Sequence, residues 1–554
     1  MKKILPLSII LFILTTSNPA ILNFKFKEKA TNIPAPMENV DIILKNCNNT
    51  QSILTFISDP SISPYQSMNY LYTSGNSFIK QVDSKDLLSR KSDLSQGVSI
   101  SIFPDSIRSD VAHKPLGINL DYFMDDDNFL KPARRTADAL KEMGVKYLRY
   151  PGGNKSDFYF FSKPPYEKSE PTLARTGRGA VHGRNAALNE DCTDFKNDVL
   201  DFDEFMAVCR EVGAEPVIVV AADEYDRDYP AGSTWSTRDE LINHAVEWVR
   251  YANLKKKYGV TYWMIANEPW VFQSNPCIYA NDVVAFSKAM KAVDSTIKII
   301  PSAILDDWWE TIFRICSDHI DDICISNYPI NTTDTLFSYT GDDNPVRIAV
   351  EAIDKYGTPE QKSKMGVIVA EFGPFNFASD DRESLVNNQR NNMINFEIMA
   401  YQLLEPRVRF SCFWNTRWIQ TRRRSGNISA FDALDHNGYF NANGYGLMIW
   451  GKYLGDNMVN AVSSAFDTLS VFSSFSPSEN KLLVYLLNKT NHAMAAEITI
   501  YDYNITGVNQ VWELKGEDLD DQKPVWSKVT GLNDPRVLLI PGATIRVIEY
   551  MVDK

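Results

Sequence analysis

From residue 116 to about residue 456, short apolar runs alternate with longer segments whose apolar residues recur at helical spacing. Short apolar runs predict buried strands, and the longer segments predict helices. The expected strands are residues 117–121, 145–150, 215–222, 262–268, 297–300, 322–327, 366–371 and 409–414. The expected helices are residues 132–143, 202–212, 237–257, 282–293, a short one at Trp308-Trp309, 383–404 and 445–454. Eight strands alternating with helices predict a (β/α)8 TIM barrel over residues 113–456.

The segments on either side of this alternation have a different pattern. Residues 457–554 contain short β-like runs at hairpin spacings, which predict a C-terminal β-sandwich. Residues 21–112 are polar and serine-rich with short β-like runs such as residues 98–102. We expect them to form a β-rich accessory segment that packs with the C-terminal strands. The predicted fold class is α/β, a TIM barrel with an accessory β-sandwich domain.

The N-terminus has the form of a secretory signal. Lys2 and Lys3 precede an apolar segment at residues 4–14, which is too short to span a bilayer. We expect residues 1–20 to be a signal peptide, no later segment to span a membrane, and the mature protein to be secreted, extracellular or periplasmic. Six Asn-x-Ser/Thr sequons would permit glycosylation in a eukaryotic host: Asn48, Asn154, Asn331, Asn427, Asn488 and Asn504.

Charge and cysteine spacing exclude some partners. A net charge of −13 argues against nucleic acid. The seven cysteines show no metal-ligand spacing, and no nucleotide or phosphate motif is present, so we expect no metal and no cofactor. Cys209, Cys324 and Cys412 fall in helix or strand patterns typical of buried thiols. Four further cysteines are disulfide candidates: Cys47, Cys192, Cys277 and Cys316.

Two of the predicted strands end in a glutamate. One ends at Asn267-Glu268-Pro269, where the proline removes a backbone donor and stops strand pairing, and another ends at Glu371. Each glutamate alone could simply cap its strand and pair with an arginine. Together, at strand ends of a barrel, they favour a glycosidase, in which one carboxyl protonates the leaving oxygen and the other attacks the sugar.

The strand count places Glu268 on the fourth strand and Glu371 on the seventh. With Asn267 before the first glutamate, residues 115–455 resemble clan A of the glycoside hydrolases. This resemblance implies that Glu268 is the acid/base, that Glu371 is the nucleophile, and that Asn267 holds the sugar 2-hydroxyl. It also implies a retaining double displacement, which needs carboxyl groups about 5–5.5 Å apart.

Other strand ends carry candidate substrate-binding residues. Arg149 ends the second strand and could keep Glu371 ionised, or form a purely structural salt bridge. Tyr328 follows the sixth strand and, by the clan A resemblance, donates to the nucleophile. Trp414 ends the eighth strand and either offers a flat face to a sugar ring or belongs to the core.

Three families of the clan share motifs with this chain. Residues 148–154 (LRYPGGN) and 202–216 look like family 51 α-L-arabinofuranosidases, in which Asn154 would contact the sugar. The proline after Glu268, and Asp121 where that family has a glutamate on the first strand, depart from it. Residues 153–158 and 441–455 are instead similar to heparanase-like family 79, and agar- and porphyran-cleaving barrels are a third resemblance.

Basic residues gather in two loops at the predicted mouth of an otherwise acidic protein. They are Arg175, Arg178, His182 and Arg184 after the second strand, and Arg417, Arg422, Arg423 and Arg424 after the eighth. Solvated loop charge is one interpretation, but guanidinium groups also suit carboxylate and sulfate. We therefore expect a secreted retaining hydrolase of a polysaccharide bearing uronate or sulfate groups, an endo-β-glycosidase of the heparanase or agarase kind. One alternative is an α-L-arabinofuranosidase acting on plant arabinan or arabinoxylan, and another is an inactive glycan-binding barrel.

Overall fold

The computed structural model describes eleven segments of the chain: residues 39–45, 51–57, 97–122, 124–173, 199–222, 237–272, 275–329, 345–374, 386–417, 430–530 and 534–554. The predicted signal peptide lies outside them. The chain divides into two compact units. The smaller contains the antiparallel hairpin of β1 (Asn39–Lys45) and β2 (Gln51–Ile57), and the larger contains the elements from β3 (Val98–Asp110) onwards.

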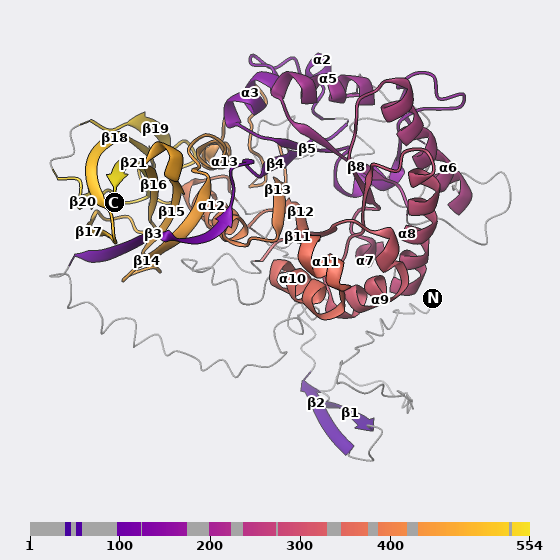
Figure 1. Cartoon of the computed structure of the whole chain (residues 1–554), viewed down its shortest axis with the longest axis horizontal. Coiled ribbons are helices and arrows are strands. Elements are labelled where there is room, and N and C mark those ends of the chain that lie inside the picture. The colour runs from indigo at the N-terminus through magenta and orange to yellow at the C-terminus, as the bar shows by residue number, and fades with distance from the viewer. Residues whose placement is uncertain are drawn as a thin grey trace, which may run out of the picture. The chain divides into compact units, whose positions relative to one another are not determined.

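The larger unit contains the predicted barrel, and Figure 1 shows its strands enclosed by helices. Eight parallel strands pair in the order β10-β9-β8-β5-β4-β13-β12-β11. They are β4 (Leu116–Asn119), β5 (Tyr147–Tyr150), β8 (Glu215–Val220), β9 (Tyr262–Ile265), β10 (Lys298–Ile300), β11 (Ile323–Asn327), β12 (Val367–Phe372) and β13 (Val408–Phe413). A parallel bridge between Ser302 and Cys324 joins the two end strands. The (β/α)8 prediction is therefore confirmed.

Most helices fall in segments where the periodicity predicted them. The longer ones are α3 (Thr136–Met143), α5 (Phe202–Val212), α6 (Arg238–Val249), α8 (Pro276–Lys291), α9 (Asp306–Cys316), α10 (Pro345–Tyr356), α12 (Gln389–Leu404) and α13 (Ala442–Lys452). Of these, α10 was not predicted. Helix α5 illustrates the local cause: Asp201 and Glu204 form a capping box at its start, and Gly213 ends it at φ +76°. The helix expected over residues 237–257 is α-helical only as far as Val249. Beyond it the chain continues as a π-helical turn, Arg250–Lys255.

The inside of the barrel is apolar up to the level of the strand ends. The buried side chains that meet there are Val217, Val219, Met264, Ile300, Cys324, Ile368, Ala370, Phe410 and Cys412. Tyr147 and Phe410 stack with ring centroids 3.9 Å apart. In a strand, alternate residues share a face. Arg149 therefore points inwards like Tyr147, and Ser326 points inwards like Cys324. Both lie two residues nearer the C-terminal ends of their strands, where the barrel interior becomes polar.

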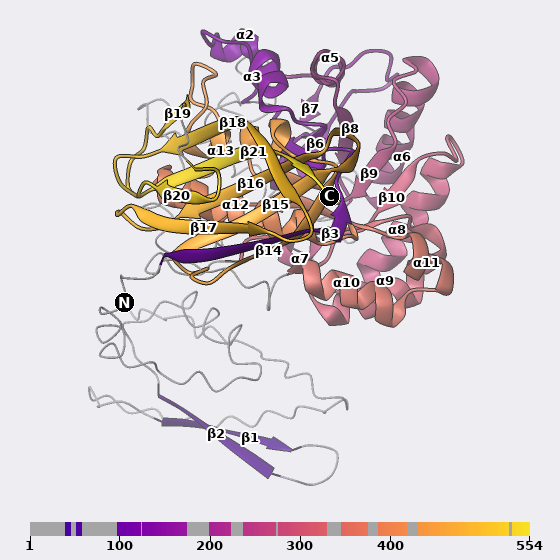
Figure 2. The ribbon, with the colours of Figure 1, turned by 60° about the vertical axis from the view of Figure 1, so that its left-hand side comes forward.

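A nine-stranded sheet forms the accessory domain, in the order β19-β18-β21-β16-β15-β14-β3-β17-β20. Its strands after the barrel are β14 (Asn457–Ser463), β15 (Leu469–Ser476), β16 (Lys481–Asn488), β17 (Met494–Ile500), β18 (Asn504–Lys515), β19 (Val525–Lys528), β20 (Val537–Ile540) and β21 (Thr544–Asp553). β3, which precedes the barrel, pairs with β14 and β17, and Figure 2 shows it lying along both strands. The sheet domain therefore does not begin at residue 457, because strands from before and after the barrel in the chain both build it.

The sheet domain packs on barrel helices α12 and α13. Tyr485 of β16 lies 4.5 Å from Trp450 of α13, measured between ring centroids. Glu397 of α12 accepts hydrogen bonds from Ser470 (2.5 Å) and Lys489 (2.8 Å) of the sheet domain. These contacts join the two domains within the larger unit.

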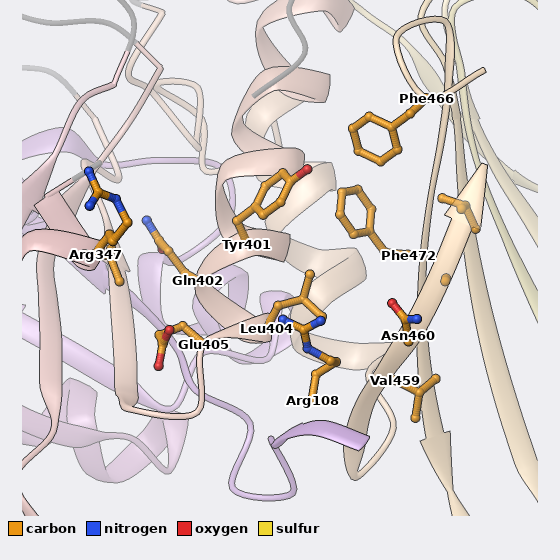
Figure 3. A pocket seen from close by; sticks show the side chains of 13 residues that line it. Arg108, Arg347, Tyr401, Gln402, Leu404, Glu405, Val459, Asn460, Phe466 and Phe472 are labelled. Atoms are coloured by element: carbon orange, nitrogen blue, oxygen red, sulfur yellow. The ribbon is translucent and has the colours of Figure 1, made fainter. Parts of the chain in front are cut away.

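A pocket of about 440 Å³ lies at this junction (Figure 3). Tyr401 and Leu404 of α12 line one side, and Phe466 and Phe472 of the sheet domain line the other. The C-terminal end of α12 leads into the start of β13. The pocket is therefore at the end of the barrel opposite the strand C-termini, away from the expected catalytic mouth.

Five cysteines in the described segments are free thiols. Cys209, Cys324 and Cys412 are buried, as predicted. The disulfide candidate Cys316 is also a buried free thiol, and its Sγ donates to the Ile312 carbonyl at 3.1 Å. Cys277 is free and exposed, while Cys47 and Cys192 lie outside the described residues.

Two of the sequons are engaged in the fold. The Asn488 side-chain nitrogen donates to three backbone carbonyls, those of His492, Ile540 and Pro541. The Asn154 side chain accepts a hydrogen bond from Asn267. Asn504 is exposed, and Asn48, Asn331 and Asn427 lie outside the described residues.

Among the residues described, no helix has both the length and the apolar character needed to cross a membrane.

Candidate active site

Glu371 lies in β12 at the mouth of the barrel, with only 4% of its surface exposed. One carboxylate oxygen accepts from Arg149 Nη1 at 2.9 Å, and the other accepts from the Tyr328 hydroxyl at 2.8 Å. A carboxyl group whose two oxygens both accept hydrogen bonds has the bonding pattern of a carboxylate. Desolvation and the charges of Glu371 and Glu268 raise the pKa of Tyr328 well above its ordinary value, so the hydroxyl keeps the proton that it donates.

An irregularity in β12 sets the direction of Glu371. Ile368 and Ala370 point into the barrel core, so strict alternation would turn residue 371 outwards, towards the helices. The pairing between β11 and β12 shifts at this point, so that Ile325 pairs with Val369 and Ser326 with Glu371. Such a bulge re-aims a side chain, and here it brings the carboxyl group to Arg149 and Tyr328.

Glu268 lies in the turn after β9, not in the strand itself. The strand ends at Ile265, both Ala266 (φ +61°) and Glu268 (φ +44°) adopt left-handed backbone conformations, and Pro269 begins the short helix α7 (Pro269–Phe272). Desolvation and the negative charge of Glu371 raise the pKa of Glu268 to about 8, against the opposing effects of Ser326 and Arg149. At neutral pH Glu268 is therefore a protonated acid beside a carboxylate.

Arg149 connects the surroundings of both glutamates. Its Nη1 also donates to Asn119 at 2.7 Å, and its Nη2 donates to Asn267 Oδ1 at 2.6 Å. The Asn267 amide nitrogen in turn donates to Asn154 at 2.6 Å, and its backbone N–H donates to Asp157 at 3.1 Å. The structure thus brings together the predicted residues Arg149, Asn154, Asn267, Glu268, Tyr328 and Glu371.

Three polar residues of this network were missed by the sequence analysis. Asn119 and Ser326 were detectable in principle, because each is a polar residue on the inward face of a buried strand. Asp157 lies in the 3-10 turn Gly153–Phe158, where no periodicity marks a functional side chain.

Asp121 and Trp414 form a second group in the mouth. Asp121 is buried and makes an ion pair with Lys155 at 3.1 Å, and Lys155 lies 5.1 Å from the centroid of the Trp414 ring. Only 3% of Trp414 is exposed, and its ring packs so closely on Gly153 that a Cβ there would approach within 2.3 Å. Trp414 is therefore a buried aromatic in the wall of the site and does not offer the open sugar platform that the sequence suggested.

Arg417 belongs to the framework of the barrel. It is buried, with Nη1 3.1 Å from both Asp125 Oδ1 and Thr136 Oγ1, and Nε 3.0 Å from the Asp435 carbonyl. Protein groups thus bind Nε and Nη1 of its guanidinium, and the expected role of Arg417 in binding substrate stays a prediction. The other seven basic loop residues lie outside the described residues.

No group of three or more metal-ligating side chains is present in the described part of the chain.

Comparison with known proteins gives a family context for this geometry. Residues 139–328 match the family model described as the α-L-arabinofuranosidase 1 domain. The chain is 27% identical over 195 residues to a probable α-L-arabinofuranosidase C of Aspergillus clavatus, covering 32% of each chain. It is 23% identical over 293 residues to an intracellular exo-α-(1→5)-L-arabinofuranosidase of Acetivibrio thermocellus, covering 48% of this chain and 53% of that protein. The chain thus spans between about a third and about half the length of these relatives.

Solved structures show the same fold over a longer stretch. An α-L-arabinofuranosidase from Thermotoga maritima superposes with a TM-score of 0.59 at 17% identity, covering 82% of this chain and 99% of that one. A family 44 xyloglucanase from Paenibacillus polymyxa superposes with a TM-score of 0.52 at 13% identity, over the same shares. At these identities the likeness concerns the fold alone. The sequence match and the likeness of fold together show that the part of the chain carrying Arg149, Asn267 and Glu268 is similar to family 51 α-L-arabinofuranosidases.

Proposed function

We propose that the protein is a retaining α-L-arabinofuranosidase. The observation that carries the proposal is the arrangement of a protonated Glu268 and a hydrogen-bonded carboxylate, Glu371, around Arg149. Arg149 and Glu268 lie within the stretch that matches the α-L-arabinofuranosidase domain. The relatives from Aspergillus clavatus and Acetivibrio thermocellus are named as enzymes of this activity.

The geometry supports a double displacement. In the first step the Glu371 carboxylate attacks the anomeric carbon while Glu268 gives its proton to the departing glycosidic oxygen. In the second step Glu268, now ionised, takes a proton from water, which attacks the same carbon and releases Glu371. Both steps proceed with inversion, so the configuration of the sugar is retained, and the two glutamates end in their starting protonation states.

The neighbouring residues bind and orient in this mechanism. Tyr328 and Arg149 hold the two oxygens of Glu371 and so fix its direction of attack. Asn267 uses one amide hydrogen for Asn154, and the second hydrogen remains for a sugar hydroxyl. The reaction needs only water and the two carboxyl groups.

The hypothesis that the substrate is an acidic polysaccharide has less support than the arabinofuranosidase hypothesis. It rested on two basic loops, and the described member of those loops, Arg417, is buried in an ion pair with Asp125. The family match favours arabinose-containing substrates. An inactive barrel is disfavoured because both glutamates are present with the partners that set their protonation states.

The test is a comparison of aryl glycosides that differ only in the sugar. We expect 4-nitrophenyl α-L-arabinofuranoside to be cleaved with a kcat/KM at least about 100-fold above the corresponding β-D-xyloside, β-D-galactoside and β-D-glucuronide, because the pocket selects its sugar in the transition state. Proton NMR of the first product should show retention. Linear α-1,5-arabinan is the polymer substrate tested in parallel, and the Glu371→Gln variant is the inactive control.

Three results would separate the alternatives. Cleavage of a sulfated or uronate-bearing polysaccharide, without cleavage of the arabinofuranoside, would restore the acidic-glycan interpretation. Glycan binding without hydrolysis of any member of the panel would indicate an inactive barrel. An inverted product would exclude the double displacement whatever the sugar.

We further propose that residues 1–20 direct export of the protein. The two lysines and the apolar run that follows them, which have the form of a secretory signal, support this proposal. Expression with and without residues 1–20, followed by assay of medium, periplasm and cytoplasm, tests it, and equal distribution of both forms would contradict it.

A further inference from the structure

Asn119 is a fully buried amide in β4, directly beneath the catalytic carboxyl groups. It has no solvent exposure. Its side-chain nitrogen donates to the backbone carbonyls of Ala370 at 3.0 Å and Phe413 at 3.2 Å. Its side-chain oxygen accepts from Arg149 Nη1 at 2.7 Å. One side chain therefore connects β4 to β12, β13 and the guanidinium of β5, and one of its contacts is the residue just before Glu371.

The chemistry of these contacts selects an amide. Two carbonyl oxygens require a donor, and the guanidinium, which has no acceptor, requires an oxygen. Aspartate would face the two carbonyls with an acceptor, and an aliphatic side chain would satisfy neither side. The orientation of the amide follows from the same argument, because the reversed amide would place donors against Arg149.

The guanidinium of Arg149 has a fixed planar shape, so a bond at one nitrogen constrains the others. Nη1 contacts both Asn119 and Glu371, and Nη2 contacts Asn267. Only 1% of Arg149 is exposed, so no solvent bond can replace a lost partner.

We propose that Asn119 is a positioning residue of the catalytic reaction, which holds the Arg149 guanidinium so that it serves Glu371 and Asn267 at once. The catalytic part of this role rests on the proposed function. Asn119 acts through Arg149 and does not touch the substrate. In the described residues, the ionisable groups around Glu371 are Arg149 from β5, Glu268 from the turn after β9, Tyr328 from the end of β11, and the buried thiols Cys324 of β11 and Cys412 of β13. Asn119 alters only the first of these directly.

The first test substitutes Asn119 with leucine, which has a similar volume and no polar atom. We expect kcat on 4-nitrophenyl α-L-arabinofuranoside to fall about 10- to 100-fold, the range expected for losing one hydrogen bond to a charged group, with a smaller change in KM. The loss should appear in kcat because a less well held guanidinium no longer fixes the direction of the Glu371 carboxylate, whereas Asn119 does not touch the sugar. Asn119→Thr is the second variant, in case the leucine variant does not fold.

The control is Asn395→Leu. Asn395 is also a buried asparagine, which bonds Asn391 and Asn443 in the contact between α12 and α13, away from the mouth. Asn395→Leu should lower Tm by a similar amount and leave kcat unchanged. A fall in Tm for Asn119→Leu and Asn119→Thr with an unchanged kcat would mean that Asn119 is structural only.

A measurement that needs no substrate separates this inference from the proposed function. In protein labelled with 13C at the glutamate carboxyl carbon, the Glu371 signal is the one that disappears in Glu371→Gln. Its chemical shift at pH 7 should differ from the wild type in Asn119→Leu, or in Asn119→Thr, because the hydrogen bond from Arg149 to the carboxylate is disturbed, and it should stay unchanged in Asn395→Leu. An unchanged chemical shift in both Asn119 variants overturns the positioning role whatever sugar the enzyme accepts, whereas failure to cleave arabinofuranosides overturns only the proposed function.

Discussion

At the scale of single residues, the two glutamates differ in their partners. Both oxygens of Glu371 accept hydrogen bonds, one from a cation and one from a phenol. Glu268 is desolvated and lies in the field of Glu371, which raises its pKa to about 8. When the environments of two carboxyl groups favour opposite protonation states, the protonated group can act as the acid and the ionised group as the nucleophile.

The division of roles predicts two distinct rescue patterns. Glu371→Ala should abolish turnover, and azide should restore part of it with an inverted arabinosyl azide, since azide then attacks in place of the carboxylate. Glu268→Ala should lose about 10²- to 10⁴-fold on poor leaving groups and little on 2,4-dinitrophenyl substrates, which leave without a proton. Azide in that variant should give the retained azide, and NMR of the products distinguishes the two. Undiminished turnover of Glu371→Ala would refute the assignment.

Ser326 provides a prediction about pH. Its hydrogen bond lowers the pKa of Glu268, so Ser326→Ala should raise that pKa further and move the alkaline limb of kcat/KM upwards from about pH 8. The limb belongs to the coupled pair of carboxyl groups and not to one residue alone. Ser302→Ala is the matched control, because Ser302 is a buried serine after the neighbouring strand that bonds Cys324 instead. A limb that stays in place in Ser326→Ala, or moves equally in both variants, would contradict this account.

At the scale of elements, the turns after the strands decide which residues meet. The turn after β5 contains Gly152 at φ +114° and Gly153 at φ +37°, and it carries Asn154 to Asn267. A Cβ at Gly153 would lie 2.3 Å from the Trp414 ring. Glycine is therefore required at Gly153 for close approach as well as for backbone conformation. This turn couples the wall of the site at Trp414 to the network around Asn267.

Gly153→Ala and Gly213→Ala form a matched pair that separates these two requirements. Both positions have positive φ, but nothing lies within 4 Å of a Cβ at Gly213. Gly213→Ala should cost about 1 kcal/mol of stability from backbone strain and leave kcat/KM unchanged. Gly153→Ala should cost about 1–3 kcal/mol more through overpacking, and it should lower kcat/KM because Asn154 moves. Chemical unfolding and kinetics measure both effects, and equal results for the two variants would show that the contact with Trp414 is unimportant.

At the scale of the whole larger unit, the sheet domain is held to the barrel partly by a buried charge. Glu397 of α12 is fully buried, and Lys489 is its cation. Burial raises the pKa of Glu397, whereas Lys489 opposes that rise. Removing the cation therefore leaves a carboxylate whose charge is costly in the folded state.

Lys489→Met should lower the free energy of unfolding by about 3–5 kcal/mol at pH 8. The loss should be smaller at pH 5, because the Glu397 carboxyl, with its folded pKa raised, can then take up a proton in the folded protein. Adding Glu397→Gln should recover part of the loss. Urea unfolding at both pH values measures these effects, with Lys481→Met, which breaks only a surface pair with Glu479, as the control. A deficit independent of pH would indicate lost packing and not an uncompensated charge.

The sequence alone determined the barrel and its eight strands, and it singled out Glu268 and Glu371 as the candidate catalytic pair. These follow from local signals, because apolar runs, helical periodicity, the caps of α5 and the Asn267-Glu268-Pro269 turn are all written in neighbouring residues. It also placed Arg149 and Tyr328 at strand ends that meet in a closed barrel. The C-terminal β domain was predicted from the hairpin spacing of its strands.

Only the tertiary structure decided what these side chains touch. The bulge that turns Glu371 inwards depends on the pairing of β11 with β12, and the burial of Trp414 depends on Gly153 of another turn. Arg417 looked like a ligand for an acidic sugar until Asp125, 292 positions away in the chain, was found to bind it. Asn119 showed its role only through carbonyls of two other strands. Composition and periodicity report whether a residue is buried and on which face, but the partner of a buried polar group is set by strands far apart in sequence, and that partner decides its chemistry.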